Sequence, residues 1–144
     1  LLAVAAPLTP ERFLVVDEAT LRAIGFSRQK SGYARHLARV ILEGKLDVDN
    51  MVNQDDGTIR TALLAIKGIG PWTADIYLLM ALRRPDIWPT GDLALQVAMQ
   101  QVKRLPQRPT PAQMEELAEP WRPWRAVAAR LLWHHYLSVR ANKT

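Results

Sequence analysis

Apolar residues recur at helical spacing along most of this sequence, and no segment alternates apolar and polar positions as a strand does. Residues 63–66 form the longest β-compatible run outside the helical pattern, and that run is short. The pattern therefore predicts an all-α fold of about eight helices.

Helix start and stop signals divide this pattern into segments. Capping residues or prolines mark five expected helix starts, at Thr9-Pro10, Asp17, Ser27, Thr110-Pro111 and Pro123. Gln113 stands where it can complete a reciprocal capping box with Thr110. Gly25 and Gly44 mark two helix ends, and the last helix is expected to run to about Arg140. Residues 45–54 lack periodicity and are predicted to be a linker.

The helix that begins after Ser27 carries two distinct faces. Its apolar stripe consists of Tyr33, Leu37, Val40 and Ile41. Its basic face consists of Arg28, Arg35 and Arg39. A solvated surface explains such a basic face by itself, and only a DNA-binding element beside it would favour nucleic acid.

Composition narrows the class of protein. The 144 residues suffice for one domain with its own core. The chain has no cysteine, which excludes disulfides, a thiol nucleophile, a cysteine-based zinc site and an iron–sulfur cluster within it. The net charge of +5 suggests a polyanionic partner, although many proteins are equally basic. No apolar run approaches the roughly 18 residues of a membrane span, and residues 1–8 lack the basic flank of a signal peptide. We expect a cytoplasmic protein with no membrane partner.

Residues 58–82 carry the most informative pattern. One helix presents Ile59, Leu63 and Ile66 on one side, and Gly68-Ile69-Gly70 then interrupts it. Pro71 begins a second helix that is apolar nearly all round and is therefore expected to be deeply buried.

A Gly-Ile-Gly interruption between two helices predicts a tight hairpin in which the isoleucine points inward. Gly68 and Gly70 would leave backbone N–H groups accessible, and those donors suit a phosphate group. An ordinary helix turn with a glycine cap is the alternative, and a lone Gly-x-Gly would favour it.

The segment IKGIGPWTAD, followed by PTGD ending at Asp92, resembles the helix–hairpin–helix (HhH-GPD) DNA glycosylase superfamily. Within it the pattern is most similar to 3-methyladenine DNA glycosylase II. The segment WRPWRAVAARLLW, residues 121–133, also resembles the C-terminal helix of that family. The resemblance extends over about residues 9–136.

This resemblance implies one HhH-GPD domain over residues 1–144, with the hairpin motif at about residues 58–82. It further implies two helical lobes with a DNA groove between them, and the hairpin and Asp92 at its mouth. In the family another helix precedes the segment at Thr9, so this chain is expected to be a compact form or a truncated product.

The resemblance assigns Asp92 the catalytic role. Cleavage of a glycosidic bond builds positive charge on the deoxyribose, and a carboxylate beneath the sugar stabilises that charge or activates water. Asp92 would also cap the helix at residues 93–103, and both roles can hold at once. Asp75 is the rival carboxylate, but we expect it to hydrogen-bond backbone or a neighbouring loop.

Trp72 and Trp133 are the residues that the family places in the base pocket, where a cationic methylated purine would stack on them. Bifunctional members have a lysine at the position of Trp72, so a monofunctional enzyme is implied. The remaining tryptophans are expected to be mainly structural: Trp88, Trp121 and Trp124.

The implied partner is duplex DNA that contains damaged bases, flipped out for reaction. The expected DNA contacts are Lys67, Gly68, Ile69, Gly70, Arg28, Arg35 and Arg39. Arg28 maps to the wedge that fills the hole left by the flipped base, where relatives carry an apolar residue. The family implies no required cofactor, but it includes a monovalent cation on hairpin carbonyls, here those of Leu64, Ile66 and Ile69. We expect a monomer that acts at the bacterial nucleoid.

A non-catalytic helix–hairpin–helix DNA-binding module is the main alternative, because such units serve that purpose in many proteins. Asp92, Trp72 and Trp133 favour the enzyme, since simple binding needs none of them. The preferred base stays open among 3-methyladenine, 7-methylguanine, 1-methyladenine, hypoxanthine and ethenoadenine.

Overall fold

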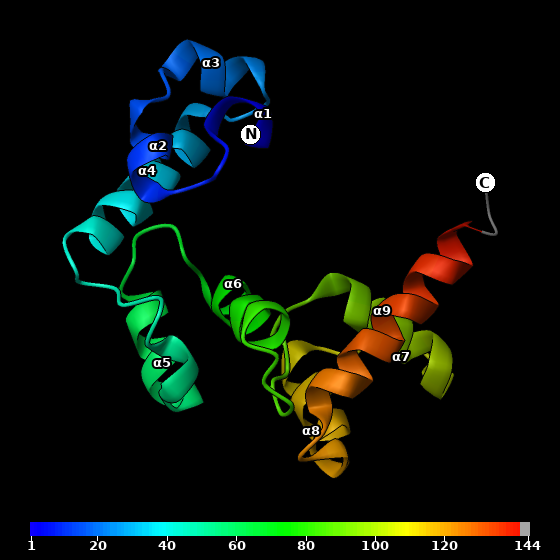
Figure 1. Cartoon of the computed structure of the whole chain (residues 1–144). Coiled ribbons are helices and arrows are strands. Elements are labelled where there is room, and N and C mark those ends of the chain that lie inside the picture. The colour runs from blue at the N-terminus through cyan, green and yellow to red at the C-terminus, as the bar shows by residue number, and fades with distance from the viewer. Residues whose placement is uncertain (142–144) are drawn as a thin grey trace. The chain divides into compact units, whose positions relative to one another are not determined.

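The computed structural model describes residues 1–141, and all regular secondary structure in that range is helical (Figure 1). This confirms the all-α prediction. The α-helices of the described residues are α1 Leu2–Ala5, α2 Pro10–Val15, α3 Glu18–Ala23, α4 Arg28–Leu42, α5 Asp56–Leu64, α6 Pro71–Ile76, α7 Leu93–Lys103, α8 Pro111–Ala118 and α9 Arg125–Ala141. Short helical segments accompany them: η1 Met51–Asn53, η2 Tyr77–Ala81 and η3 Glu119–Trp121. Among residues 1–141, no helix is both long and apolar enough to cross a membrane.

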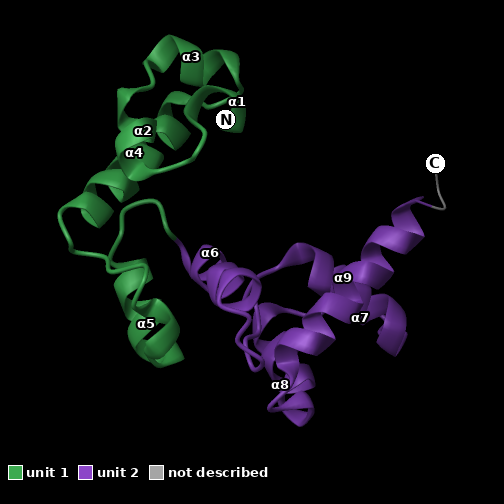
Figure 2. Cartoon of the chain, in the orientation of Figure 1, with its two compact units in different colours: residues 1–69 green, residues 70–144 purple. Residues whose placement is uncertain are grey.

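The chain divides into two compact units, Leu1–Ile69 and Gly70–Thr144 (Figure 2). In unit 1, α2 packs against α4. In unit 2, α7 packs against α9 and α8 packs on α7. The division does not decide whether the chain acts as one domain, so that stays a prediction.

The helix caps lie where the sequence pattern predicts them. Four side chains accept a hydrogen bond from the backbone N–H three residues on: those of Thr9, Asp17, Ser27 and Thr110. Gln113 completes the capping box of α8. Gly25 and Gly44 end α3 and α4 with φ of +94° and +67°, a conformation that side chains with a Cβ rarely adopt. Local signals were therefore sufficient to place these termini.

The packed face of α4 differs from the predicted apolar stripe. The helix places Ser31, Ala34 and Ala38 against the core, which also contains Phe13 and Leu21. The stripe at Tyr33, Leu37, Val40 and Ile41 is only half-buried. Small residues on α4 let α2 approach closely, and close packing decided the buried face more than side-chain hydrophobicity did.

The predicted linker at residues 45–54 is partly structured. It contains η1, and Leu46 and Met51 are buried. Asp55 then caps α5 by accepting from Thr58 N–H, so the hairpin motif begins slightly earlier than expected. Acidic and amide residues separate Leu46 from Met51, so the segment shows no apolar periodicity in its sequence although both residues are buried.

The helix after the hairpin is buried on one face only, which corrects the prediction of deep burial all round. Ala74, Asp75, Leu78 and Leu79 are buried, whereas Trp72 and Met80 are about half exposed. A π-turn, η2, replaces the end of the expected α-helix. Widening the helix there shifts the positions that face the core, and an α-helical period cannot anticipate this shift.

The last helix begins at Arg125 rather than at Pro123. Trp124 N–H donates to the Trp121 carbonyl at 2.7 Å, and Ala126 N–H donates to the Pro85 carbonyl at 2.9 Å. The latter bond directs a free N–H of the first turn to another segment of unit 2. Long-range pairing, invisible to a local pattern, therefore sets the start of α9.

Candidate functional site

Asp92 occupies the N-cap of α7 and is 9% exposed. Its Oδ1 accepts a hydrogen bond from Leu95 N–H at 2.9 Å. Its Oδ2 accepts one from the indole Nε1–H of Trp72 at 2.8 Å. Both donors are neutral, so neither contact cancels the negative charge of an ionised carboxylate. Each carboxylate oxygen has capacity for a further contact. The helix-capping role that the sequence offered as an alternative is thus confirmed.

Trp72 lies in the first turn of α6, directly after Pro71. Its indole N–H points at Asp92, yet the residue as a whole is 47% exposed. A tryptophan offers only one hydrogen-bond donor, at one edge of the ring. Trp72 can therefore hold the carboxylate with that edge while much of its apolar ring remains available for contact.

The other predicted pocket tryptophan, Trp133, lies on α9 and is half-buried. Both residues belong to unit 2, but the contacts described for Asp92 involve Trp72 and Leu95. A position of Trp133 beside Asp92 stays a prediction.

Asp75 is 3% exposed, and its Oδ2 accepts a hydrogen bond from Thr90 N–H at 3.3 Å. This confirms the expectation that it binds the backbone of a neighbouring loop. The contact gives Asp75 a structural role in holding the loop that leads to Asp92.

The loop that leads to Asp92 is held by a buried arginine on α9. Arg125 donates Nε to Asp86 Oδ1 at 2.7 Å and Nη2 to Asp86 Oδ2 at 3.0 Å. Arg122 Nη1 contacts Asp86 Oδ2 at 2.7 Å. Burial acts to raise the pKa of Asp86, but the hydrogen bonds and charge of Arg125, with that of Arg122, lower the pKa below its ordinary value.

Sequence reasoning did not single out Asp86 or Arg125. The available signal was two arginines, Arg122 and Arg125, within an otherwise aromatic and apolar segment. Charged residues in such a setting are usually paired when they become buried. The pattern does not identify the partner, since Asp86 lies 39 positions from Arg125.

The structural tryptophans divide into two kinds. Trp88 is buried and packs on Trp121 with ring centroids 5.9 Å apart, as expected. Trp124 is 60% exposed, so its expected packing role is wrong. Trp124 directly precedes α9.

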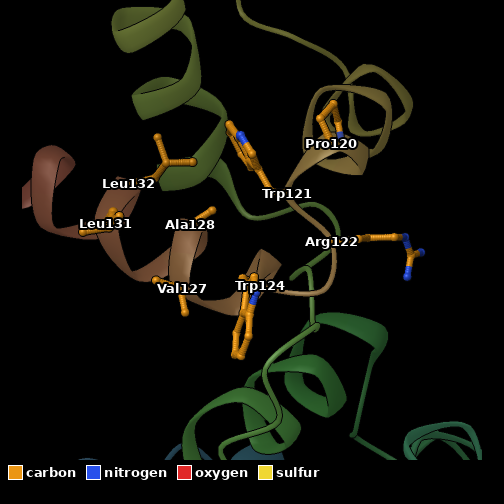
Figure 3. Close-up of a pocket in the computed structure, with 8 residues that line it drawn as sticks. All are labelled: Pro120, Trp121, Arg122, Trp124, Val127, Ala128, Leu131 and Leu132. Carbon is orange, nitrogen blue, oxygen red and sulfur yellow. The ribbon is translucent and has the colours of Figure 1, made fainter.

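Trp124 lines an open pocket of about 510 Å³ together with Trp121, Val127 and Leu131 (Figure 3). The Arg122 side chain extends away from the other lining residues in that view. Neither Asp92 nor Trp72 lines this pocket. It therefore does not coincide with the carboxylate site.

At the hairpin, Gly68 has a φ of +99° and lies under the ring of Tyr33. A Cβ at Gly68 would overlap Tyr33 Cγ. Gln29 Nε2 in turn donates to Tyr33 Oη at 3.0 Å. The glycine is required here both by backbone conformation and by close approach.

The other hairpin residues differ in how accessible they are to a binding partner. Ile69 is half-buried, and its N–H donates to the Ile66 carbonyl at 3.0 Å. That bond occupies one lone pair of a carbonyl predicted to bind a cation and leaves the other. Lys67 is exposed. Accessible N–H groups at Gly68 and Gly70, and cation binding by Leu64, Ile66 and Ile69, stay predictions.

The basic face of α4 separates into two functions. Arg28 and Arg39 are exposed. Arg35 instead donates to the carbonyls of Leu14, at 2.8 Å, and Val16. These bonds satisfy carbonyls at the end of α2, so Arg35 has a structural role and we correct its assignment as a DNA contact.

Comparison with known proteins identifies the family. Residues 3–123 match the family model described as HhH-GPD superfamily base excision DNA repair protein. The chain is 32% identical to DNA-3-methyladenine glycosylase 2 of Escherichia coli over 88% of its length, and 32% identical to DNA-3-methyladenine glycosylase 1 of Schizosaccharomyces pombe over 87%. It spans 42% and 55% of those relatives, or about half their length.

Solved structures agree with this match. A 3-methyladenine DNA glycosylase from Schizosaccharomyces pombe, in complex with abasic DNA, superposes with a TM-score of 0.83 at 31% identity, over 87% of this chain and 61% of that one. A DNA-3-methyladenine glycosidase from Bacillus halodurans gives a TM-score of 0.76 at 29% identity, over 89% and 59%. The fold, the hairpin sequence and the family match lead to one conclusion: this chain belongs to the HhH-GPD superfamily of base excision DNA repair proteins.

Proposed function

We propose that this chain is a monofunctional DNA glycosylase that hydrolyses the N-glycosidic bond of alkylated bases, of the 3-methyladenine type, in duplex DNA. The observation that carries the proposal is the Asp92 carboxylate, fixed at the start of α7 by Leu95 N–H and by the indole of Trp72. The names of the relatives support the substrate class, since the chain matches several 3-methyladenine glycosylases.

In this reaction the bond between C1′ of the sugar and the base nitrogen breaks, and its electron pair leaves with the base. Positive charge develops on the sugar, and the nearby carboxylate of Asp92 stabilises it electrostatically. A water oxygen then bonds to C1′, and the water releases a proton to Asp92 or to solvent. Two neutral donors on Asp92 suit this role, because they orient the carboxylate and leave its charge uncompensated.

Trp72 stands where bifunctional members of the superfamily have a lysine. Without an amine at that position, no Schiff base forms with the sugar, and the product is an abasic site in an unbroken strand. The half-exposed indole ring of Trp72, with Trp133, would stack on the flipped cationic base.

DNA would be held mainly through its phosphates. The hairpin would contact DNA phosphates through Lys67, Gly68, Ile69 and Gly70. On α4, further phosphate contacts would come from Arg28 and Arg39. Arg28 would also serve as the wedge. The carbonyls of Leu64, Ile66 and Ile69 would hold a monovalent cation against a phosphate, while the chemistry requires no cofactor. The enzyme would act as a monomer in the cytoplasm.

The decisive experiment measures release of 3-methyladenine from methylated duplex DNA by the wild type and by Asp92→Asn. We expect release by the wild type, a loss of about 100- to 1,000-fold in the variant, and strand cleavage only after alkali. Asp49→Asn is the matched control, because it makes the same chemical change at an exposed residue that is distant from Asp92 in the sequence. That control should match the wild type.

Other outcomes would separate the alternatives. Strand cleavage without alkali would contradict the monofunctional proposal. A folded wild type that binds DNA but releases no base from methylated, deaminated or etheno-modified substrates would favour a non-catalytic DNA-binding module. In that case Asp92→Asn should leave DNA affinity unchanged.

A further inference from the structure

Thr90 lies two residues before Asp92 and is bound by carboxylates from two different helices. Its N–H donates to Oδ2 of Asp75 on α6 at 3.3 Å. Its hydroxyl donates to Oε1 of Glu115 on α8 at 2.9 Å. Because both the backbone and the side chain are engaged, Thr90 has little freedom to rotate or shift.

Glu115 connects this contact to the arginine that holds the other end of the same loop. Its Oε2 lies 3.9 Å from Nη1 of Arg125. Arg125 in turn binds the carboxylate of Asp86, and its Nη2 also donates to the Asp86 carbonyl at 2.9 Å. The segment from Asp86 to Thr90 is thus restrained at its beginning and its end by one connected set of charged groups.

Only Gly91 separates Thr90 from Asp92, and it has a φ of +78°. The glycine makes the bend sterically accessible but cannot restrain it, because it has no side chain to pack. The backbone position of Asp92 therefore depends on restraints at neighbouring residues, of which Thr90 is one. The bonds from Trp72 and Leu95 to the carboxylate depend on where the backbone places Asp92.

We propose that Thr90 and Glu115 are positioning residues that set the location of the Asp92 carboxylate through their mutual hydrogen bond. The inference rests on the proposed glycosylase function and identifies what places its catalytic group. Glu115 has a side chain that is 44% exposed, so its pairing contributes little to the free energy of unfolding. Its loss should therefore appear in the reaction rate, which depends steeply on the position of a catalytic group.

The first test observes the position of Asp92 without using activity. The indole N–H of Trp72 donates to Asp92, so its signal in a ¹H–¹⁵N correlation spectrum reports that hydrogen bond. Trp72→Phe assigns the signal by removing it. We expect Thr90→Val to shift the signal, because valine keeps the shape but lacks the hydroxyl. Thr90→Ser, which restores the hydroxyl, should return it.

The second test measures single-turnover release of 3-methyladenine and, separately, affinity for abasic-site DNA. Thr90→Val and Glu115→Ala should each lower the rate by about 10- to 100-fold, with DNA affinity and melting temperature nearly unchanged. Thr90→Ser should recover most of the rate. The double variant Thr90→Val/Glu115→Ala should be no slower than the slower single variant, since both remove one interaction.

Distinct results overturn the two proposals. If the wild type releases base, and Thr90→Val neither slows release nor shifts the Trp72 signal, the positioning role is wrong and the glycosylase function stands. Additive rate losses in the double variant would likewise contradict an interaction between Thr90 and Glu115. If the wild type releases no base, the proposed function fails, and the Trp72 signal alone decides whether Thr90 places Asp92.

Discussion

The hairpin at residues 67–70 and the turn that ends at Asp92 are held in place by different kinds of interaction. At the hairpin, Gly68 takes a positive φ beneath the ring of Tyr33, and Ile69 N–H bonds to a nearby carbonyl. At the turn, Thr90 is bound by side chains from two helices, and Arg125 holds the start of its loop.

The difference agrees with the roles proposed for the two segments. A segment that offers backbone N–H groups to a phosphate must keep side chains out of the way, so small residues and local bonds suffice. A segment that presents a carboxylate must be restrained without losing the negative charge. Here the charged partners lie at Asp86 and Glu115, while Asp92 itself meets neutral donors. The charges stabilise the loop, and the negative charge of the Asp92 carboxylate is left uncompensated.

The largest stability effect is expected at the arginine that anchors the turn. Arg125→Met should lower the free energy of unfolding by roughly 3 kcal/mol, because it leaves Asp86 without its main partner in a largely buried setting. Arg122→Met is the matched control, since that side chain also contacts Asp86 but is 50% exposed. It should cost clearly less than Arg125→Met, because solvent screens the ion pair of an exposed arginine. Chemical denaturation measures both, and equal losses would show that burial does not distinguish the two arginines.

A second pair of variants examines the hairpin. Gly68→Ala should destabilise the protein by about 1–3 kcal/mol, because the residue has a positive φ and its Cβ would overlap the Tyr33 ring. Gly70→Ala should be nearly neutral, since its φ is −95° and no described heavy atom lies within 4 Å of the new Cβ. Denaturant unfolding compares the two. Similar losses of unfolding free energy would contradict a steric requirement for glycine at Gly68 alone.

Lowering the pH should destabilise the loop that leads to Asp92 and leave the hairpin unaffected. The pKa of Asp86 in the folded protein lies below its ordinary value of 3.8, so its ion pair stabilises the fold above that pH. This contribution is lost as the pH falls through the lower, folded-state pKa. Thermal melts of the wild type and Asp86→Asn should differ most near neutral pH and converge as the pH falls from 3.8 through the lower, folded-state pKa. A constant difference across that range would contradict the assignment.

The smallest effect is expected on DNA binding by the hairpin. Lys67→Ala should reduce the slope of log affinity against log salt concentration by about 0.9, as expected for one lost phosphate contact. Lys45→Ala is the control, because that lysine pairs with Glu43 at 2.6 Å. Affinity for undamaged duplex DNA across a salt series measures both. An unchanged slope for Lys67→Ala would remove this lysine from the DNA contact.

Sequence reasoning located what depends on neighbouring residues. Caps at Thr9, Asp17, Ser27 and Thr110 require only a side-chain oxygen and an N–H three positions on. The helix at residues 93–103 and its cap Asp92 were placed correctly for the same reason. These interactions lie within one helical turn, so a single sequence specifies them.

Sequence reasoning failed where distant groups decide the outcome. Helical spacing groups Arg35 with Arg28 and Arg39. In the structure, however, its guanidinium donates hydrogen bonds to two backbone carbonyls at the end of α2. The restraint on Asp92 by Thr90 and Glu115 joins residues 25 positions apart. Likewise, the π-turn after α6 exposes residues that an α-helical pattern buries. No local period encodes such pairings.

The shared indole of Trp72 also limits how this chain could evolve. One side chain supplies both the donor that holds Asp92 and a broad exposed aromatic surface. A lysine at this position would supply an amine but remove that surface and bring a cation to the carboxylate. A single substitution at this position would therefore alter both the support of the Asp92 carboxylate and the exposed aromatic surface.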